Sequence, residues 1–488
     1  MTRSWSAACR VQAAKPSNLV NMKPNSKAVL LVATMALLSP SCQRQGEAPH
    51  TVATPSASPT VVLAVTVPIT LPVLDALLAD ESFRAELKSR LQITDEQIAS
   101  LRKTSSEEVT KLRRANAENQ AGSAETSRQN AIEAIRRVIG AEKSEQLLAL
   151  ARDRWNKGSE EIEATAAKDA EPTMLKGPNA IPKDTRVVVN IPAFRMDVFQ
   201  DGSLTKSYKV GIGYPEFPLP QGLRKAQLII FNPTWTPPDS PWVNSMAVTP
   251  GEVIAAGNKQ NPLGPIKIPI GSPSLIHGGK PLAKIGTFAS HGCVGMTNGQ
   301  VKDFAKVLAQ ASQTQLSDQT ITAYLKNRTK TRTVKLANLV PVELRYETIV
   351  VEDGRLHIYR DVYDQNTNTE ENLRAVLEAN GISFEDLGAE EKAPVLDALN
   401  AMSRNPKKQP TPKPSAVGNR NAAEKLARAN ERKAEAERQK KLRNQKEIVI
   451  EIALLARRGY PAPVSLDSGA GTQLSVIANS PPPATTRP

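Results

Sequence analysis

The stretch Ser290-His291-Gly292-Cys293, preceded by His277-Gly278, decides how this sequence is interpreted. A thiol nucleophile needs a base that takes its proton and main-chain donors that hold the oxyanion formed on attack. A thiol near a histidine can titrate below its usual pKa of about 8.5. Glycines allow positive φ angles and close approach of a substrate to main-chain N–H groups. The stretch therefore predicts a cysteine nucleophile, and we expect a hairpin-like return of the chain to bring His277 to Cys293.

Residues 276–279 read Ile-His-Gly-Gly, and residues 289–298 read Ala-Ser-His-Gly-Cys-Val-Gly-Met-Thr-Asn. This pattern resembles the active-site signature of the L,D-transpeptidases, peptidoglycan cross-linking enzymes with a YkuD-type catalytic domain. The resemblance extends over residues 185–352. Four further segments are similar to the family's strand, turn and cleft segments: 208–213, 218–222, 232–235 and 261–265.

The resemblance implies a role for each residue of the site. Cys293 is the expected nucleophile and His277 the general base, while the carbonyl of Gly278 orients His277. Ser290 braces the loop rather than reacts. The main-chain N–H groups expected to line the oxyanion site belong to His291, Gly292 and Cys293. From its own position two residues before Cys293, the side chain of His291 is a second catalytic candidate, which is expected to act partly through the geometry of the loop.

One position departs from the family pattern. The family usually has arginine two residues after the cysteine, where this chain has Gly295. The change removes a fixed cation that braces the loop or meets a substrate carboxylate. Catalysis needs the thiolate and base first, so we expect activity with an altered donor or acceptor preference. A degenerate, non-catalytic copy of the domain is the alternative.

Other cysteine–histidine chemistries fit the sequence less well. Papain-like peptidases usually place the cysteine before the base, whereas both His277 and His291 precede Cys293. Sortases share the order, but their Thr-Leu-x-Thr-Cys signature is absent from the sequence. Zinc sites usually need more cysteine or histidine ligands at metal spacing, although one cysteine and two histidines make three. We expect no metal and no cofactor, because thiolate, base and oxyanion donors suffice.

Hydrophobic patterning favours a mainly β catalytic domain, a sandwich or barrel with a short helix after the active-site loop, plus helical accessory regions. Asp201-Gly202 and Asp353-Gly354 each separate two alternating runs, which predicts two hairpins. The helix is expected near residues 298–311, where its N-terminal dipole helps to stabilise a thiolate. His357 falls in the last of these strands and is expected to be exposed.

The N-terminus predicts export. Residues 22–27 are basic, residues 28–38 are apolar, and Ser39-Pro40-Ser41-Cys42 follows. The apolar run is too short to span a bilayer, so residues 1–42 are expected to be a signal peptide. Cys42 directly after it resembles a bacterial lipoprotein signal, with Met22 as the initiator; ordinary cleavage without lipid is the alternative. The mature chain then keeps Cys42 and Cys293, and an acylated Cys42 leaves Cys293 without a disulfide partner.

The remaining length predicts several modules. The segments expected after the signal peptide are a Pro/Ser/Thr-rich tether (43–71), a helical region (72–157), the catalytic domain (185–352), a hairpin and helical extension (353–403), a basic Lys/Pro linker and helix (404–446), and a short helix at 447–458 with a disordered tail (447–488 together).

Most of the chain's formal charge of +14 lies in one segment. Residues 404–446 hold 14 Lys and Arg against 4 Asp and Glu, a net charge of +10. Such a basic tail can adhere to anionic wall polymers or to a membrane surface. A solvated helix with no specific ligand is an equal alternative, and nucleic acid is excluded as a partner if the protein is exported to the envelope.

By resemblance, the acyl donor is a peptidoglycan stem tetrapeptide ending in D-alanine. Cys293 is expected to form a thioester with release of D-alanine, and an amine of a neighbouring stem resolves it. Two alternatives stay open. Water resolves the thioester in an L,D-carboxypeptidase, and a non-catalytic scaffold binds the wall through its basic segment. The protein is expected on the periplasmic side of the envelope, anchored to a membrane by lipid.

Overall fold

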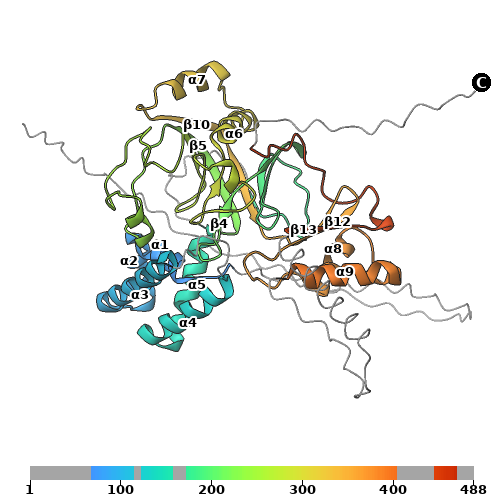
Figure 1. The fold of residues 1–488 in the computed structure, drawn as a ribbon, viewed down its shortest axis with the longest axis horizontal. Helices are drawn as coiled ribbons and strands as arrows, with labels where there is room; N and C mark the ends of the chain where they lie inside the picture. Colours follow the sequence, from blue (N-terminus) through green and yellow to red (C-terminus); the bar gives the residue numbers. More distant parts are fainter. Residues whose placement is uncertain (1–66, 115–122, 158–171, 404–444, 470–488) are drawn as a thin grey trace, which may run out of the picture. The chain divides into compact units, whose positions relative to one another are not determined.

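One eight-stranded sheet runs through residues 186–345 in the order β3-β2-β1-β10-β5-β6-β7-β9 of the computed structural model (Figure 1). Its strands are β1 (Arg186–Asn190), β2 (Arg195–Gln200), β3 (Ser203–Lys209), β5 (Gly222–Phe231), β6 (Ile266–Pro269), β7 (Leu275–His277), β9 (Val294–Gly295) and β10 (Arg332–Arg345). β1 pairs with β10 and β7 with β9 in parallel, and the other neighbours are antiparallel. β4 (Ile212–Gly213) and β8 (Phe288–Ser290) form a separate parallel pair. The mainly β fold expected for this region is confirmed.

The structure describes residues 67–114, 123–157, 172–403 and 445–469. The expected signal peptide with Cys42, nearly all of the expected tether, the basic residues 404–444 and the C-terminal residues 470–488 lie outside the described residues. Among the helices of the described part, none is long and apolar enough to cross a membrane.

Two Asp-Gly pairs turn the chain back on itself as the sequence predicts. Asp201 and Gly202 have φ angles of 49° and 80° and connect β2 to β3. Asp353 and Gly354 have φ angles of 48° and 76° and connect β11 (Ile349–Glu352) to β12 (Arg355–Tyr359). Positive φ at both central residues is what a type I′ turn requires, and aspartate and glycine tolerate it. Both predicted hairpins are confirmed.

The helix after the active-site loop, α6, spans Asn298–Ala311, as expected. Thr297 and Gln300 form a capping box, in which each side chain accepts a hydrogen bond from the other's main-chain N–H. The buried face of the helix packs in the core of the large sheet through Val301, Phe304 and Leu308. α7 (Asp318–Lys326) follows and buries Ile321 in the same core.

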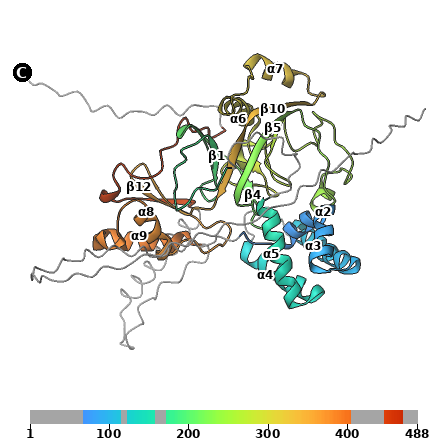
Figure 2. The same cartoon turned by 180° about the vertical axis from the view of Figure 1, so that it is seen from behind.

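The N-terminal described residues form five helices: α1 (Leu71–Leu78), α2 (Glu81–Leu91), α3 (Asp95–Arg114), α4 (Ala124–Ile139) and α5 (Ala141–Lys157). Their buried faces meet in a hydrophobic cluster that includes Leu74, Phe83, Ile135 and Trp155. The C-terminal end of α5 contacts β5, and both views show the two elements side by side (Figures 1 and 2). The helices therefore touch the large sheet directly.

A three-stranded sheet, β11-β12-β13, follows the large sheet. It packs with α8 (Glu370–Ala379) and α9 (Ala389–Met402) through a core of its own. β13 spans Glu447–Glu451, so the short helix predicted at 447–458 is wrong; the strand is followed by a single 3-10 turn, η4 (Ala453–Leu455). The run Glu-Ile-Val-Ile-Glu alternates with the period of a strand, and the free edge of β12 gives it a partner.

His357 is another correction. It lies on β12 between β11 and β13, and its side chain is buried rather than exposed. Its Nδ1 is hydrogen-bonded to a carboxylate oxygen of Glu447, the first residue of β13. The expectation failed because β13, predicted as a helix, pairs along the edge of β12 and brings the Glu447 side chain against the His357 ring.

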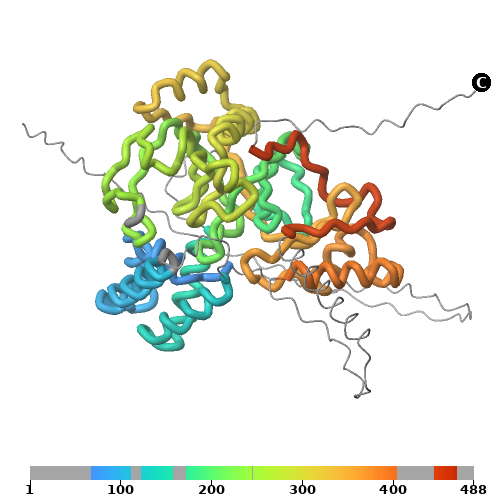
Figure 3. The backbone as a smooth tube through the Cα atoms, in the orientation of Figure 1, coloured from blue at the N-terminus to red at the C-terminus, as the bar shows by residue number. Residues whose placement is uncertain are grey.

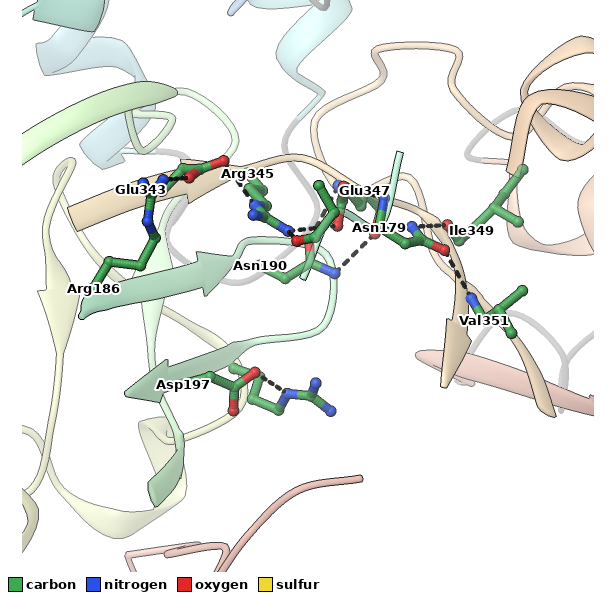
Figure 4. Close-up of polar contacts among 11 residues, drawn as sticks. Asn179, Arg186, Asn190, Asp197, Glu343, Arg345, Glu347, Ile349 and Val351 are labelled. Carbon is green, nitrogen blue, oxygen red and sulfur yellow. Dashed lines mark hydrogen bonds and ion pairs between the residues drawn. The ribbon is translucent and has the colours of Figure 1, made fainter. Parts of the chain in front are cut away.

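A buried polar seam joins the two sheets where β10 leads into β11 (Figure 4). Asn179 donates to the Ile349 carbonyl at 3.0 Å and accepts from the Val351 N–H at 2.9 Å. Glu343 pairs with both Arg186 and Arg345, and Arg195 pairs with both Asp197 and Glu352. Buried charges are tolerated when each has a partner, and removal of one partner is costly. The seam therefore favours a fixed junction between the sheets.

The chain returns to the large sheet after β13. The N–H groups of Ser207 and Lys209 on β3 donate to the carbonyls of Val464 and Asp467, each at 2.9 Å. Figure 3 shows this last described segment, in red, beside the teal strands of the large sheet. Before β13, the Asp361 N–H donates to the Met402 carbonyl at 3.0 Å and the Arg360 N–H to the Lys446 carbonyl at 2.9 Å. The basic segment is therefore bounded by folded chain on both sides and is not a tail.

Candidate active site

Cys293 and His277 lie on neighbouring parallel strands. In the β7–β9 register Ile276 pairs with Val294 and His277 with Gly295. Cys293 directly precedes β9, so continuing the register places it across from Leu275 and diagonally across from His277. With strands about 4.8 Å apart and a rise of about 3.3 Å per residue, the diagonal Cα separation is about 8 Å, which side chains can bridge. The register thus places the two residues on neighbouring parallel strands, and not on the hairpin-like return that we expected.

Cys293 is a half-buried, free cysteine. Burial raises the pKa of its thiol; a hydrogen bond from the Leu275 main chain and the positive charges of Lys280 and Lys267 oppose that rise without cancelling it. The prediction that a nearby histidine lowers the thiol pKa is therefore wrong. The thiol rests in its neutral form, so attack on an acyl group requires a base.

His277 is buried and neutral. Burial, helped by the positive charge of Lys280, lowers the pKa of His277 to about 3, and hydrogen bonds to the carbonyls of Gly278 and Leu263 oppose this shift. Nδ1 lies 2.7 Å from the Gly278 oxygen, the contact expected of an orienting carbonyl. A proton on Nδ1 leaves Nε2 as the basic atom. After proton uptake, the carbonyls of Gly278 and Leu263 stabilise the imidazolium.

Ser290 holds the nucleophile loop (residues 290–293) closed. Its hydroxyl donates to the Cys293 carbonyl at 2.5 Å and accepts from the Cys293 N–H at 3.0 Å. The Cys293 N–H is therefore engaged, contrary to its expected place in the oxyanion site, and the N–H groups of His291 and Gly292 are the remaining candidates. The buried hydroxyl of Ser274 donates to the Gly292 carbonyl at 2.9 Å. No sequence pattern singled out Ser274.

The imidazole of His291 is surrounded by aromatic rings. It stacks on Trp242 at 4.4 Å between ring centroids and meets the edges of Phe217 and Tyr214 at 4.5 and 5.4 Å. Trp242 belongs to η1 (Pro241–Ser245), far from the motif in sequence. These contacts fix the His291 side chain relative to the nucleophile loop, and no sequence pattern indicates them.

Lys280 occupies the space beside Gly295. A Cβ built on Gly295 would lie 2.8 Å from Cγ and 3.0 Å from Cε of Lys280. The Lys280 N–H donates to the Met296 carbonyl at 3.1 Å, which holds the lysine backbone alongside β9. The absence of a side chain at Gly295 thus makes room for a cation from another part of the chain. The fixed positive charge that we expected to be lost has a replacement nearby.

Comparison with known proteins decides the family of this region. Residues 184–334 match the family model described as the YkuD L,D-transpeptidase catalytic domain. Residues 184–334 form a YkuD-type domain. The match includes β7, the nucleophile loop and β9, and it ends within β10. No curated protein sequence matches the chain.

Several solved structures resemble the chain at low identity. The catalytic domain of the E. faecium L,D-transpeptidase is 14% identical with a TM-score of 0.22, and the match covers 34% of this chain and all of that one. The L,D-transpeptidase of Mycobacterium smegmatis is 15% identical with a TM-score of 0.19, covering 33% of this chain and 58% of that one. The avibactam carbamoyl enzyme of Ldtfm is 14% identical with a TM-score of 0.21. The match covers 34% of this chain and 49% of that one. The chain thus spans about half the length of the last of these structures, and the family assignment rests on the domain match.

The described residues also form a cavity away from Cys293, His277 and His291. A cavity of about 680 Å³ is lined mostly by acidic and amide side chains of α4, α9 and the segment before α8, and neither Cys293 nor the two histidines line it. In the described part of the chain, no group of three or more His, Cys, Asp or Glu side chains is arranged to hold a metal ion.

Replacement of Lys280 tests its electrostatic role in the YkuD-type domain. Lys280→Gln removes a positive charge that favours the thiolate of Cys293, so the apparent pKa of the thiol should rise. Alkylation of Cys293 by iodoacetamide, followed by peptide mass spectrometry, should shift its pH profile to higher pH and slow at pH 8. Lys302→Gln, on the exposed face of α6, is the matched control and should leave the profile in place. An unchanged profile in Lys280→Gln would contradict the role.

Proposed function

We propose that the protein is a peptidoglycan L,D-transpeptidase. The observation that carries the proposal is the placement of Cys293 diagonally across a parallel strand pair from the neutral His277, within a YkuD-type domain. The donor would be a stem tetrapeptide ending in D-alanine, and the acceptor an amine of a second stem. Both identities come from the family, and the geometry supports the chemistry of the first half-reaction.

The first half-reaction forms a thioester. Nε2 of His277 takes the thiol proton of Cys293, and the sulfur attacks the carbonyl carbon of the third residue. The C–S bond forms, the C–N bond to D-alanine breaks, and the imidazolium returns its proton to the leaving amine. The oxyanion of the tetrahedral intermediate would be held by the main-chain N–H groups of His291 and Gly292.

The second half-reaction restores the thiol. The acceptor amine attacks the thioester carbonyl, its proton passes to His277, and the C–S bond breaks as the new amide C–N bond forms. The thiolate then recovers the proton from the imidazolium. Water in place of the amine yields a tripeptide and defines the L,D-carboxypeptidase alternative, because the same thioester precedes both products.

Mass spectrometry of defined peptidoglycan fragments tests the proposal. Purified disaccharide tetrapeptide incubated with the protein should yield a cross-linked dimer that has lost one D-alanine. A trimmed tripeptide alone would replace the transpeptidase by the carboxypeptidase. Unchanged substrate, from a protein whose Cys293 still alkylates normally, would favour the non-catalytic scaffold.

We further propose that the chain is exported and carries lipid on Cys42, with the basic segment contributing contacts to anionic wall polymers or a membrane surface. The run from the apolar residues 28–38 to Cys42 supports the anchor. Cys42→Ser should move the protein from the membrane fraction to the soluble envelope fraction, because acyl chains supply the attachment. Unchanged fractionation would mean that the basic segment or the wall holds the protein.

A further inference from the structure

The indole of Trp155 contacts the nucleophile loop from the helical region. Trp155 lies in the last turn of α5 and belongs to the hydrophobic cluster of the five helices. A Cβ placed on Gly292 would lie 3.2 and 3.3 Å from Cζ2 and Cη2 of Trp155, so the ring packs directly on the backbone of Gly292. Gly292 has a φ of 94° and immediately precedes Cys293. The residue before the nucleophile is therefore in contact with a side chain that lies far from it in sequence.

The same indole also forms a hydrogen bond to a second segment beside the nucleophile loop. Its Nε1 donates to the Pro218 carbonyl at 3.2 Å. Pro218 belongs to the Pro218 loop (residues 214–221), which also provides Phe217 against the His291 ring. One ring thus contacts both the Pro218 loop and the nucleophile loop.

Polar contacts fix the end of α5 in this position. The buried Arg224 of β5 donates to the Trp155 carbonyl and, at 3.0 Å, to the Gly271 carbonyl. The Gln221 N–H donates to Oδ1 of Asn156 at 3.3 Å. A cation at a helix C-terminus stabilises its unpaired carbonyls. These contacts tie the last turn of α5 to the start of β5 and to the Pro218 loop.

A second set of contacts links the helical region to the ring that stacks on His291. The Ser240 hydroxyl donates to the buried Asp75 of α1 at 2.6 Å, and Arg102 of α3 pairs with Asp239 at 2.8 Å. Both partners directly precede η1, which carries Trp242. The helices therefore support both side chains that press on the nucleophile loop, Trp155 on Gly292 and Trp242 on His291.

We infer that Trp155 is a positioning residue for the nucleophile loop, and that the helical region forms a wall of the active site instead of an independent accessory module. The inference rests on the proposed function where it concerns catalysis. Trp155 touches no reacting atom; it fixes the backbone of Gly292, whose N–H is an oxyanion candidate. Misplacement of such a donor by about 1 Å lowers the acylation rate by up to about 10²-fold.

Two substitutions at Trp155 separate the ring contact from the hydrogen bond. Trp155→Phe keeps an aromatic ring near Gly292 and removes the donor to Pro218, whereas Trp155→Leu removes both. Phe83→Leu is the matched control, because Phe83 is fully buried in the same helical cluster but lies on α2. Thermal unfolding of the full chain measures how far each variant destabilises the helices.

Hydrogen exchange gives the readout that does not depend on activity. In Trp155→Leu, peptides covering residues 288–296 should exchange about tenfold faster than in the wild type, because the loop opens more often. Trp155→Phe should show a smaller increase and Phe83→Leu none at these residues. Unchanged exchange in Trp155→Leu, or an equal increase in Phe83→Leu, would overturn the inference. If Trp155→Leu fails to fold, hydrogen exchange still tests the positioning role, because Trp155→Phe is then compared with Phe83→Leu.

Catalysis provides the second readout. In the wild type, D-alanine release from a stem tetrapeptide should be measurable, and Trp155→Leu should lower kcat by at least about tenfold with a small change in KM. An equal loss of kcat in Phe83→Leu would mean that Trp155 has a structural role and no positioning role. A wild type that releases no D-alanine would refute the proposed function, while the exchange result would still support or overturn the positioning role.

Discussion

Cys293→Ala is expected to abolish D-alanine release from a stem tetrapeptide, with a loss of at least about 10³-fold, because the thioester cannot form without the sulfur. The substitution removes one atom from a half-buried side chain, so the thermal unfolding temperature should change little. A coupled assay of free D-alanine measures the loss, and circular dichroism during heating checks the fold.

Cys293→Ser is the informative companion to this variant. It keeps a hydroxyl in the place of the thiol and tests whether a weaker nucleophile sustains slow turnover. A carbapenem should add covalently to the wild type at Cys293 and not to Cys293→Ala. D-Alanine release by Cys293→Ala at a substantial fraction of the wild-type rate would place the chemistry at another residue.

His277→Ala is expected to slow acylation of Cys293 by about 10²-fold or more, the scale of losing a general base. Burial raises the pKa of the thiol, so few molecules carry a thiolate at neutral pH without help. In the variant, acylation should therefore rise steadily as the pH is increased toward the thiol pKa. In the wild type, the pKa of His277 near 3 keeps the base neutral, so acidification from pH 7 to pH 5 should not protonate it.

His291→Ala is the control for this assignment. His291 is held by Trp242, Phe217 and Tyr214, so its loss should loosen the nucleophile loop and lower activity by a smaller factor. The rate of carbapenem addition, measured by mass spectrometry from pH 5 to pH 10, compares the two variants. A steep alkaline dependence in His291→Ala, with a wild-type profile in His277→Ala, would exchange the roles of the two histidines.

Local sequence predicted those parts of the molecule that depend on near neighbours. Asp201-Gly202 and Asp353-Gly354 dictate hairpins because few residue pairs tolerate two positive φ angles. Thr297 caps α6 through Gln300, three residues further on. The run at 447–451 forms a strand and not the predicted helix, because its alternation spans only five residues and its strand partner, β12, lies far back in the sequence.

The surroundings of the motif could not be predicted in the same way. Trp155, Trp242 and Lys280 reach the nucleophile loop through tertiary packing, and no spacing in the sequence indicates such contacts. The predicted direction of the Cys293 pKa shift is wrong for the same reason. Burial raises the thiol pKa more than nearby charges lower it, and burial is set by the whole fold.

The neighbouring N–H groups of Arg360 and Asp361 hold the two ends of the basic segment, which has a consequence for engineering this protein. Truncation at residue 404 would strip β13 from its sheet and the last described segment from β3, so such a variant would misreport the function of the charges. Excision of residues 404–444, with a short Gly/Ser connector joining the adjacent ends, would remove the charges and spare both pairings. By the same geometry, a protease cut inside the segment would leave two polypeptides that stay associated.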